Sequence, residues 1–271
     1  MIDPLVDAIR ARQVILFVGA GVSMNLGLPS WSTLISEMGS QLDFEPMVFK
    51  SHGDLLELAE YYRLKKTSLG ALRSWMDRTW HTQEERVDVS DIHQAIVDLQ
   101  CPIIYTTNYD RWLEIAFQRR GKSFVKIANV GDFTKICDGV TQIVKLHGDF
   151  EDDTSLVLTE TSYFERLAFE SPLDIKLRSD SIGRPILFIG YGFADVNIRY
   201  LQYKLDRMWS ESAYSAARPK SFMFLARPNP VRETILDRRG IFPVVSEADD
   251  PAKGLAAFLK RLVREAFGGT A

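Results

Sequence analysis

The sequence is poor in cysteine and in long apolar runs, and each shortage excludes a class of protein. Among its 271 residues, the two cysteines Cys101 and Cys137 stand far apart and form no C-x-x-C pair. A structural zinc site takes about four closely spaced ligands and a disulfide scaffold takes several cysteine pairs, so both are disfavoured. No apolar run approaches the about 20 residues of a membrane span, and no basic leader with an apolar core precedes the first strand. We therefore expect a soluble cytoplasmic protein without a metal ion.

An excess of either charge is also lacking. The 33 Lys and Arg residues nearly balance the 36 Asp and Glu residues, which gives a net charge of −3. Wholesale neutralisation of nucleic-acid phosphates calls for a strongly basic surface, so direct nucleic-acid binding is not indicated. Hydrophobic residues make up 46% of the chain, enough for a full core, and residues 1–271 are expected to form a single domain.

What the sequence does have is a buried strand that runs into glycines. Residues 14–18 are all apolar and are followed directly by Gly19-Ala20-Gly21. A continuous apolar run predicts a strand covered on both faces, and the glycines let backbone N–H groups approach a phosphate closely at a helix N-terminus. We expect a dinucleotide here. A tight turn without a ligand is the alternative, because the third Rossmann glycine and the lysine of a nucleoside triphosphatase loop are missing.

Apolar runs and helical patterns then alternate along the chain. Further strands are expected at 102–106, 142–146, 185–189, 221–226 and 241–245. Helices are expected at 3–12, 111–118, 159–181, 196–209, 231–239 and 252–267. Regular alternation of this kind predicts an α/β fold with a Rossmann-like, doubly wound parallel sheet.

One long stretch interrupts this alternation. From residue 54 to about residue 100 the chain shows only helical periodicity between two sheet strands, and we expect the insertion to span residues 44–100. An excursion of this length is expected to be a helical insertion subdomain, which would form a lid over the site.

Polar and small residues follow the expected strands where each one ends. Thr107, Asn108 and Asp110 follow the strand at 102–106, and His147 follows the strand at 142–146. The strand at 185–189 is followed by Gly190, Tyr191 and Asp195. Ligands bind outside the carboxyl ends of parallel strands, so these residues are expected to face one crevice. The alternatives are that Asn108 or Asp110 only caps the next helix and that His147 is a core histidine.

Four motifs in this order resemble the NAD-binding motifs of the sirtuin family. They are Gly19-Ala20-Gly21-Val22-Ser23 with Gly27-Leu28-Pro29, Thr107-Asn108-Tyr109-Asp110, Lys145-Leu146-His147-Gly148 and Gly190-Tyr191. The resemblance implies an NAD⁺ site at the carboxyl edge of the sheet, with cleavage of the bond between nicotinamide and ribose.

The resemblance also implies a role for each residue. The pyrophosphate would be held by Gly19, Ala20, Gly21 and Ser23. Asn108 would contact the nicotinamide ribose and position the attacking group, Asp110 would lie near the nicotinamide, and His147 would be the base. The remaining residues of the expected cofactor site are Thr107, Gly190, Tyr191 and Asp195, of which Gly190 and Tyr191 would line the adenosine side.

Departures from the sirtuin pattern narrow the expected function. The chain cannot build a four-cysteine zinc ribbon, and Pro29-Ser30-Trp31-Ser32 stands where protein deacetylases have Pro-x-Phe-Arg. In these respects it resembles the sirtuin-like NAD⁺ hydrolases of bacterial antiphage defence. That resemblance implies an NAD⁺ glycohydrolase that works with a partner protein such as a HerA-type ATPase, and we expect a homo-oligomer.

Two other classes of function remain open. A protein deacylase or ADP-ribosyltransferase would use the same NAD⁺ but pass the ribose to a second substrate. A non-catalytic NAD or ADP-ribose sensor would bind without turnover, although a pure binding module needs no base at His147.

Overall fold

A parallel sheet forms the centre of the protein, seen in a computed structural model that describes residues 2–152, 155–168, 170–192 and 196–268. The described strands are β1 (Ile15–Val18), β2 (Ile103–Thr106), β3 (Phe124–Ile127), β4 (Thr141–Lys145), β5 (Ile186–Ile189), β6 (Ser221–Leu225) and β7 (Ile241–Val245). They pair in the order β3-β4-β2-β1-β5-β6-β7, and every pairing is parallel. The predicted doubly wound α/β fold is confirmed, with β1 in the middle, where the order of the strands reverses.

Alternate residues of the central strand supply two separate cores. Leu16 and Val18 belong to the cluster that covers one face, and Ile15 and Phe17 belong to the cluster on the other face. The first face is covered by α1 (Asp3–Arg10), α7 (Asp91–Asp98), α8 (Trp112–Arg119) and α13 (Pro251–Phe267). The second face is covered by α10 (Pro172–Ile182), α11 (Val196–Ser210) and α12 (Pro230–Arg238). All four residues of β1 are buried, as its unbroken apolar run predicts.

The prediction of one helix over 159–181 is wrong. Two helices lie there, α9 (Glu160–Arg166) and α10 (Pro172–Ile182). The side chain of Ser171 accepts a hydrogen bond from the Asp174 N–H, and Pro172 occupies the first turn of α10. Serine at the cap and proline at the first position are a start signal for a helix, so a new helix begins at this point.

The sheet has one strand that the sequence analysis did not expect. Strand β3, Phe124–Ile127, lies at the edge of the sheet and pairs only with β4 among the described strands. Three of its four residues are only partly buried, and its third residue is the charged Lys126. A short, half-exposed edge strand of this kind lacks the continuous apolar run that marks the central strands.

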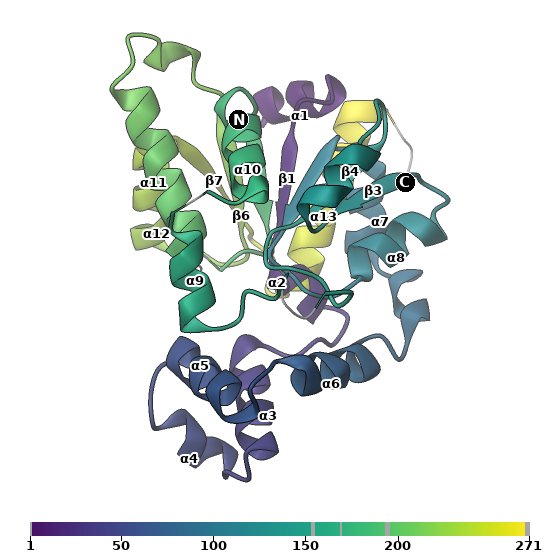
Figure 1. Cartoon of the computed structure of the whole chain (residues 1–271). Helices are drawn as coiled ribbons and strands as arrows, with labels where there is room; N and C mark the ends of the chain where they lie inside the picture. Colours follow the sequence, from purple (N-terminus) through teal and green to yellow (C-terminus); the bar gives the residue numbers. More distant parts are fainter. Residues whose placement is uncertain (1, 153–154, 169, 193–195, 269–271) are drawn as a thin grey trace.

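A third group of helices lies at the carboxyl end of the sheet. It contains α3 (Trp31–Gln41), α4 (Pro46–Lys50), α5 (Leu55–Lys66) and α6 (Gly70–Trp80), which form a third hydrophobic cluster together with Tyr109, Phe150, Leu156 and Leu158. Figure 1 shows these helices gathered below the sheet, next to the short α2 (Ala20–Met24) that follows β1. The separate cluster therefore begins at α3, earlier than the expected boundary at 44, while α7 packs on the sheet.

Three short 3₁₀ helices complete the described elements. They are η1 (Glu84–Val87), η2 (Val130–Lys135) and η4 (Ser215–Ala217). Within the described residues, no helix is both long enough and apolar enough to cross a membrane.

Candidate active site

A cavity of about 890 Å³ opens at the carboxyl ends of the central strands. Most of the residues predicted for the site line it, namely Ala20, Gly21, Ser23, Thr107, Asn108, Asp110, His147, Gly190 and Tyr191. Gly19 is not among its lining residues, and Asp195 lies outside the described residues. Leu55 and Leu56 of α5 and Trp80 of α6 also line the cavity. Its volume is that of a pocket for a small organic ligand or cofactor.

The glycine turn after β1 packs directly against the turn after β5. The Gly21 N–H donates a hydrogen bond to the Gly190 carbonyl oxygen over 2.9 Å. A Cβ atom at Gly19 would lie 2.4 Å from that same oxygen, and one at Gly190, where φ is +61°, would lie 2.7 Å from the Val22 nitrogen. Two backbone segments can approach this closely only without side chains, so the glycines hold the two halves of the sheet together beside the cavity.

Asn108 joins the loop after β2 to the glycine turn. Its Nδ2 donates hydrogen bonds to Ser23 Oγ over 2.9 Å and to the Gly19 carbonyl oxygen over 3.2 Å. Its backbone N–H donates to Thr106 Oγ1 over 3.0 Å. The side chain lines the cavity and is 8% exposed, and its buried Oδ1 has no hydrogen-bond partner in the described part of the protein. An acceptor in this state is available to a ligand hydroxyl.

Asp110 lies just before α8 and lines the cavity. Its Oδ1 accepts a hydrogen bond from the Trp112 N–H over 3.1 Å at the start of α8, where Arg111 is the N-cap residue. Burial raises the pKa of the carboxyl group, while the nearby Lys145 ammonium group and a hydrogen bond from Ser23 act against that rise. A buried carboxyl group with a raised pKa is a frequent feature of functional sites.

His147 comes from a third strand end. It lies two residues beyond β4, lines the cavity and is 3% exposed. Its ring meets the Tyr163 ring of α9 edge to face, with centroids 5.3 Å apart, and its carbonyl oxygen accepts from the Val157 N–H over 3.0 Å. The ring is thus fixed on one side by packing and faces the cavity with the other, as a positioned base requires.

His81 connects the helical group to the same loop. Its Nε2 accepts a hydrogen bond from the Arg111 N–H over 2.9 Å, and its ring packs against Trp112 and Phe150. Burial and the neighbouring Arg111 guanidinium lower the pKa of His81 to about 4. This histidine is therefore a neutral packing residue and not a candidate base.

A cationic part of the cavity was not predicted from the sequence. Arg227 follows β6, Arg232 lies on α12, and both line the cavity together with Asn229, which caps α12 by accepting from the Arg232 N–H. No ion pair is found for either guanidinium group among the described residues. The signal that could have identified Arg227 was the one used for Asn108 and His147, because it also follows directly on an apolar strand.

Among the described residues, no group of three or more His, Cys, Asp or Glu side chains is placed to hold a metal ion. Both cysteines are free thiols, Cys101 buried and Cys137 exposed.

The fold and the position of the cavity define a Rossmann-like α/β domain with a ligand-sized pocket where the strand order reverses. Residues 102–244 match the family model described as the SIR2-like domain. The chain belongs to this family, which confirms the predicted relation to sirtuins.

Curated relatives share the sequence at a modest level. "NAD(+) hydrolase ThsA" of Enterococcus faecium is 29% identical over 196 residues, which are 71% of this chain and 40% of that protein. The protein of the same name from Bacillus cereus (strain MSX-D12) is 27% identical over 81% of this chain and 44% of its own length. "Defense-associated sirtuin 2" of Bacillus subtilis is 27% identical over 87% of this chain and 23% of its own length. The chain thus spans less than half the length of these relatives.

One solved structure is similar over nearly the whole chain. It is a crystal structure of a SIR2 homolog–NAD complex, with 13% identity, a TM-score of 0.48 and coverage of 97% of this chain and 92% of that one.

Proposed function

We propose that this domain binds NAD⁺ in the cavity and hydrolyses it to nicotinamide and ADP-ribose. The observation that carries the proposal is that the loops after β2 and β4 deliver Asn108, Asp110 and His147 to one cavity beside the glycine turn. The relation to proteins named NAD(+) hydrolase supports it. Cleavage passes through a ribose with positive charge at C1′, so the site needs a firm grip on the dinucleotide, polar groups near the ribose and a base.

The residues divide this work between them. Water attacks C1′ of the nicotinamide ribose, the N-glycosidic bond breaks, and its electron pair returns to the nicotinamide ring nitrogen. His147 takes the proton from the water, as an imidazole can near neutral pH. The unpartnered Oδ1 of Asn108 accepts a hydrogen bond from a ribose hydroxyl or from the water. Asp110 borders the nicotinamide, where its carboxyl group can form a hydrogen bond with the carboxamide.

The rest of the dinucleotide lies along the two sets of backbone turns. Ala20, Gly21 and Ser23 contact the pyrophosphate, as Gly19 does in the prediction from sequence, and Thr107 adds a polar contact. Gly190 and Tyr191 line the adenosine side. Arg227 and Arg232 supply the positive charge that the pyrophosphate requires, since no other arginine and no lysine lines the cavity among the described residues.

The helical group from α3 to α6 acts as a lid in this proposal. Leu55, Leu56 and Trp80 border the cavity, so movement of α5 or α6 would change access to it. The lid role of residues 44–100 stays a prediction. So do a cytoplasmic location, a homo-oligomeric state and a role as the NAD⁺-depleting effector of an antiphage system that acts with a partner such as a HerA-type ATPase.

A second candidate reaction shares the first step. A deacylase or ADP-ribosyltransferase would pass the ribose to a second substrate, and a sensor would release NAD⁺ unchanged. The cavity favours hydrolysis over pure sensing, because His147 and Asn108 offer a base and an acceptor that binding alone does not need.

The test is chromatography of NAD⁺ after incubation with the protein, with its partner or trigger supplied. Hydrolysis yields nicotinamide and free ADP-ribose in equal amounts. Acetyl-ADP-ribose or a labelled protein in place of free ADP-ribose would identify a transferase, and intact NAD⁺ under activating conditions would identify a binding module.

A further inference from the structure

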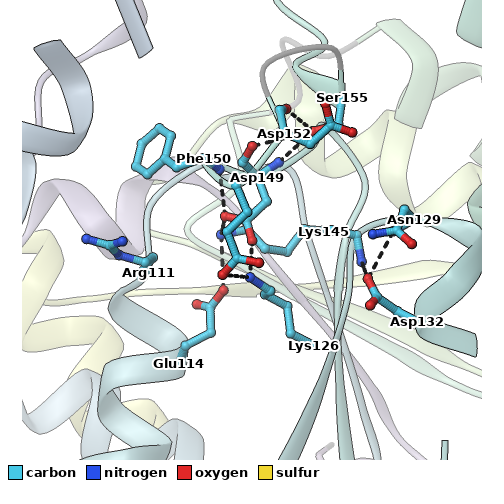
Figure 2. A network of polar contacts seen from close by, with 12 residues as sticks. Arg111, Glu114, Lys126, Asn129, Asp132, Lys145, Asp149, Phe150, Asp152 and Ser155 are labelled. Carbon is cyan, nitrogen blue, oxygen red and sulfur yellow. Dashed lines mark hydrogen bonds and ion pairs between the residues drawn. The ribbon is translucent and has the colours of Figure 1, made fainter. Parts of the chain in front are cut away.

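A fully buried lysine lies directly behind the cavity. Lys145 is the last residue of β4, two positions before His147, and its side chain has no exposed surface. Its Nζ donates hydrogen bonds to the carbonyl oxygen of Tyr109 over 3.0 Å and to that of Asp110 over 2.6 Å. It also meets Glu114 Oε1 at 3.1 Å and Asp149 Oδ1 at 3.4 Å (Figure 2).

These contacts differ from those of an ordinary buried ion pair. A buried ammonium group is costly to desolvate, and two carboxylates would suffice to neutralise it. Lys145 nevertheless directs two hydrogen bonds at the backbone of the loop between β2 and α8. This loop carries Asn108 and Asp110, whose side chains line the cavity. The ammonium group therefore holds a loop in place as well as balancing charge.

We propose that Lys145 is a positioning residue that fixes Asn108 and Asp110 relative to His147. Lys145 and His147 leave the same strand two residues apart, so one short segment sets the place of the base and, through two carbonyl groups, the place of the loop opposite it. This inference rests on the proposed function, because it assigns the loop to NAD⁺ cleavage. A reacting group displaced by about 1 Å can lose about 100-fold in rate.

Because of the charges around Lys145, variants can separate its positioning role from its contribution to stability. Asp149 has a second cation, Lys126 (Figure 2). Lys126 also pairs with Glu151 at 2.7 Å. Asp149 therefore keeps a partner when Lys145 is replaced. Glu114, with 8% of its side chain exposed, has no other ion-pair partner among the described residues. Replacing both Lys145 and Glu114 removes the pair without leaving Glu114 as a buried, unpaired carboxylate.

The experiment compares Lys145→Met with the double variant Lys145→Met/Glu114→Gln. Arg218→Met is the matched control, because Arg218 also pairs with a carboxylate, Asp206, and donates to a backbone carbonyl, that of Arg239, at the opposite edge of the sheet. For each protein, kcat and KM for NAD⁺, the melting temperature and hydrogen exchange of residues 107–112 are measured.

We expect Lys145→Met to melt about 5–15 °C lower and to lose about 30-fold or more in kcat, with KM changed less than about threefold. The double variant regains much of the melting temperature but keeps the low kcat and the fast exchange of residues 107–112. Arg218→Met melts lower and keeps a kcat within about threefold of the parent.

Recovery of kcat along with melting temperature in the double variant would overturn the inference and leave Lys145 with a role in stability alone. If the parent protein leaves NAD⁺ intact under activating conditions, the proposed function fails. Hydrogen exchange then tests the positioning role of Lys145 without reference to activity. Faster exchange of residues 107–112 in the double variant supports the positioning role, and unchanged exchange contradicts it.

Discussion

Two groups of buried polar residues lie side by side at the carboxyl edge of the sheet, and they use their hydrogen-bonding capacity differently. In the inner group, Lys145 pairs with Glu114 and Asp149, and Lys126 gives Asp149 a second cation, so the charges are matched within the protein. In the cavity group, Asn108 keeps a buried oxygen without a partner in the described structure. Both groups are costly to bury, yet only the second has capacity left for a ligand.

The comparison separates the residues that give the site its shape from those that act on a substrate. Changes in the inner group should lower both stability and activity, because they leave charges unpaired. Changes in the cavity group should lower activity and leave stability nearly unchanged, because the side chains border an open space and not a packed core.

The largest effect is expected for His147→Ala. Loss of a positioned base should slow NAD⁺ cleavage by about 10²–10⁴-fold, while the melting temperature falls by no more than about 3 °C. Single-turnover cleavage and thermal melting are the measurements, with the exposed Val231→Ala of α12 as control. If His147→Ala melts far below the parent, His147 belongs to the core and the distinction fails.

Asn108→Ala tests the border between the two groups. It removes the free oxygen and also the hydrogen bonds to Ser23 and Gly19. We expect cleavage to fall by about 10²-fold or more and the free energy of unfolding to fall by about 1–2 kcal/mol. Denaturant unfolding gives the second value. A variant that keeps its rate would show that the ribose is held elsewhere.

Glu114→Leu is the corresponding change in the inner group. Lys145 would lose one of its two carboxylate partners, so the free energy of unfolding should fall by about 3 kcal/mol. Equilibrium unfolding in urea measures this loss. An unchanged free energy of unfolding would mean that Asp149 alone neutralises Lys145.

Substitution of His93 tests whether a buried side-chain atom without a hydrogen-bond partner is by itself evidence of a ligand site. It is fully buried on α7, its Nδ1 lies 2.8 Å from Ser90 Oγ, and its Nε2 has no partner in the described structure. Burial lowers the pKa of His93 from 6.5 to about 4. A lowered pKa in the folded state contributes stability that is fully present above about pH 6.5 and is lost as the pH falls towards 4.

The free energy of unfolding should therefore fall by about 2 kcal/mol between pH 7.5 and pH 5 because of His93. His93→Asn keeps a side-chain atom near Ser90 and removes this titration. Melting curves at the two pH values should show a smaller difference for the variant, with NAD⁺ cleavage at pH 7.5 close to that of the parent. An equal pH dependence in the two proteins would show that the imidazole stays accessible to protons.

The smallest effect is expected at the cationic end of the cavity. Arg227→Ala should raise KM for NAD⁺ about tenfold and change kcat by less than about threefold, because an exposed guanidinium group binds the dinucleotide equally in the ground state and the transition state. Steady-state kinetics measure both constants. A fall in kcat at constant KM would instead place Arg227 near the reacting bond.

Sequence patterns predicted the central sheet because buried parallel strands are continuous apolar runs, as at 14–18 and 185–189. They also predicted that Asn108 and His147 would face a common crevice, because ligands bind where such strands end. Strand β3 was not predicted, because a half-exposed strand of four residues that includes a lysine is not a continuous apolar run.

The position of Lys145 shows a different limit. A lysine at the end of an apolar run is normally solvated, and only the tertiary structure shows that Glu114 and the carbonyl groups of Tyr109 and Asp110 surround it. In the same way, the cluster shared by α3 and α6 depends on contacts between helices that are distant along the chain. Contacts of this kind have no local signature.

The backbone hydrogen bond between Gly21 and Gly190 has a consequence for folding during protein synthesis. It joins two residues that are 169 positions apart in the chain, and the glycine turn takes its final form only when β5 has paired with β1. A chain emerging from the ribosome folds from its N-terminus, so its first two-thirds can be compact while the cavity is still unformed. Under the proposed function, a nascent chain would therefore be unable to cleave NAD⁺ until translation has passed Gly190.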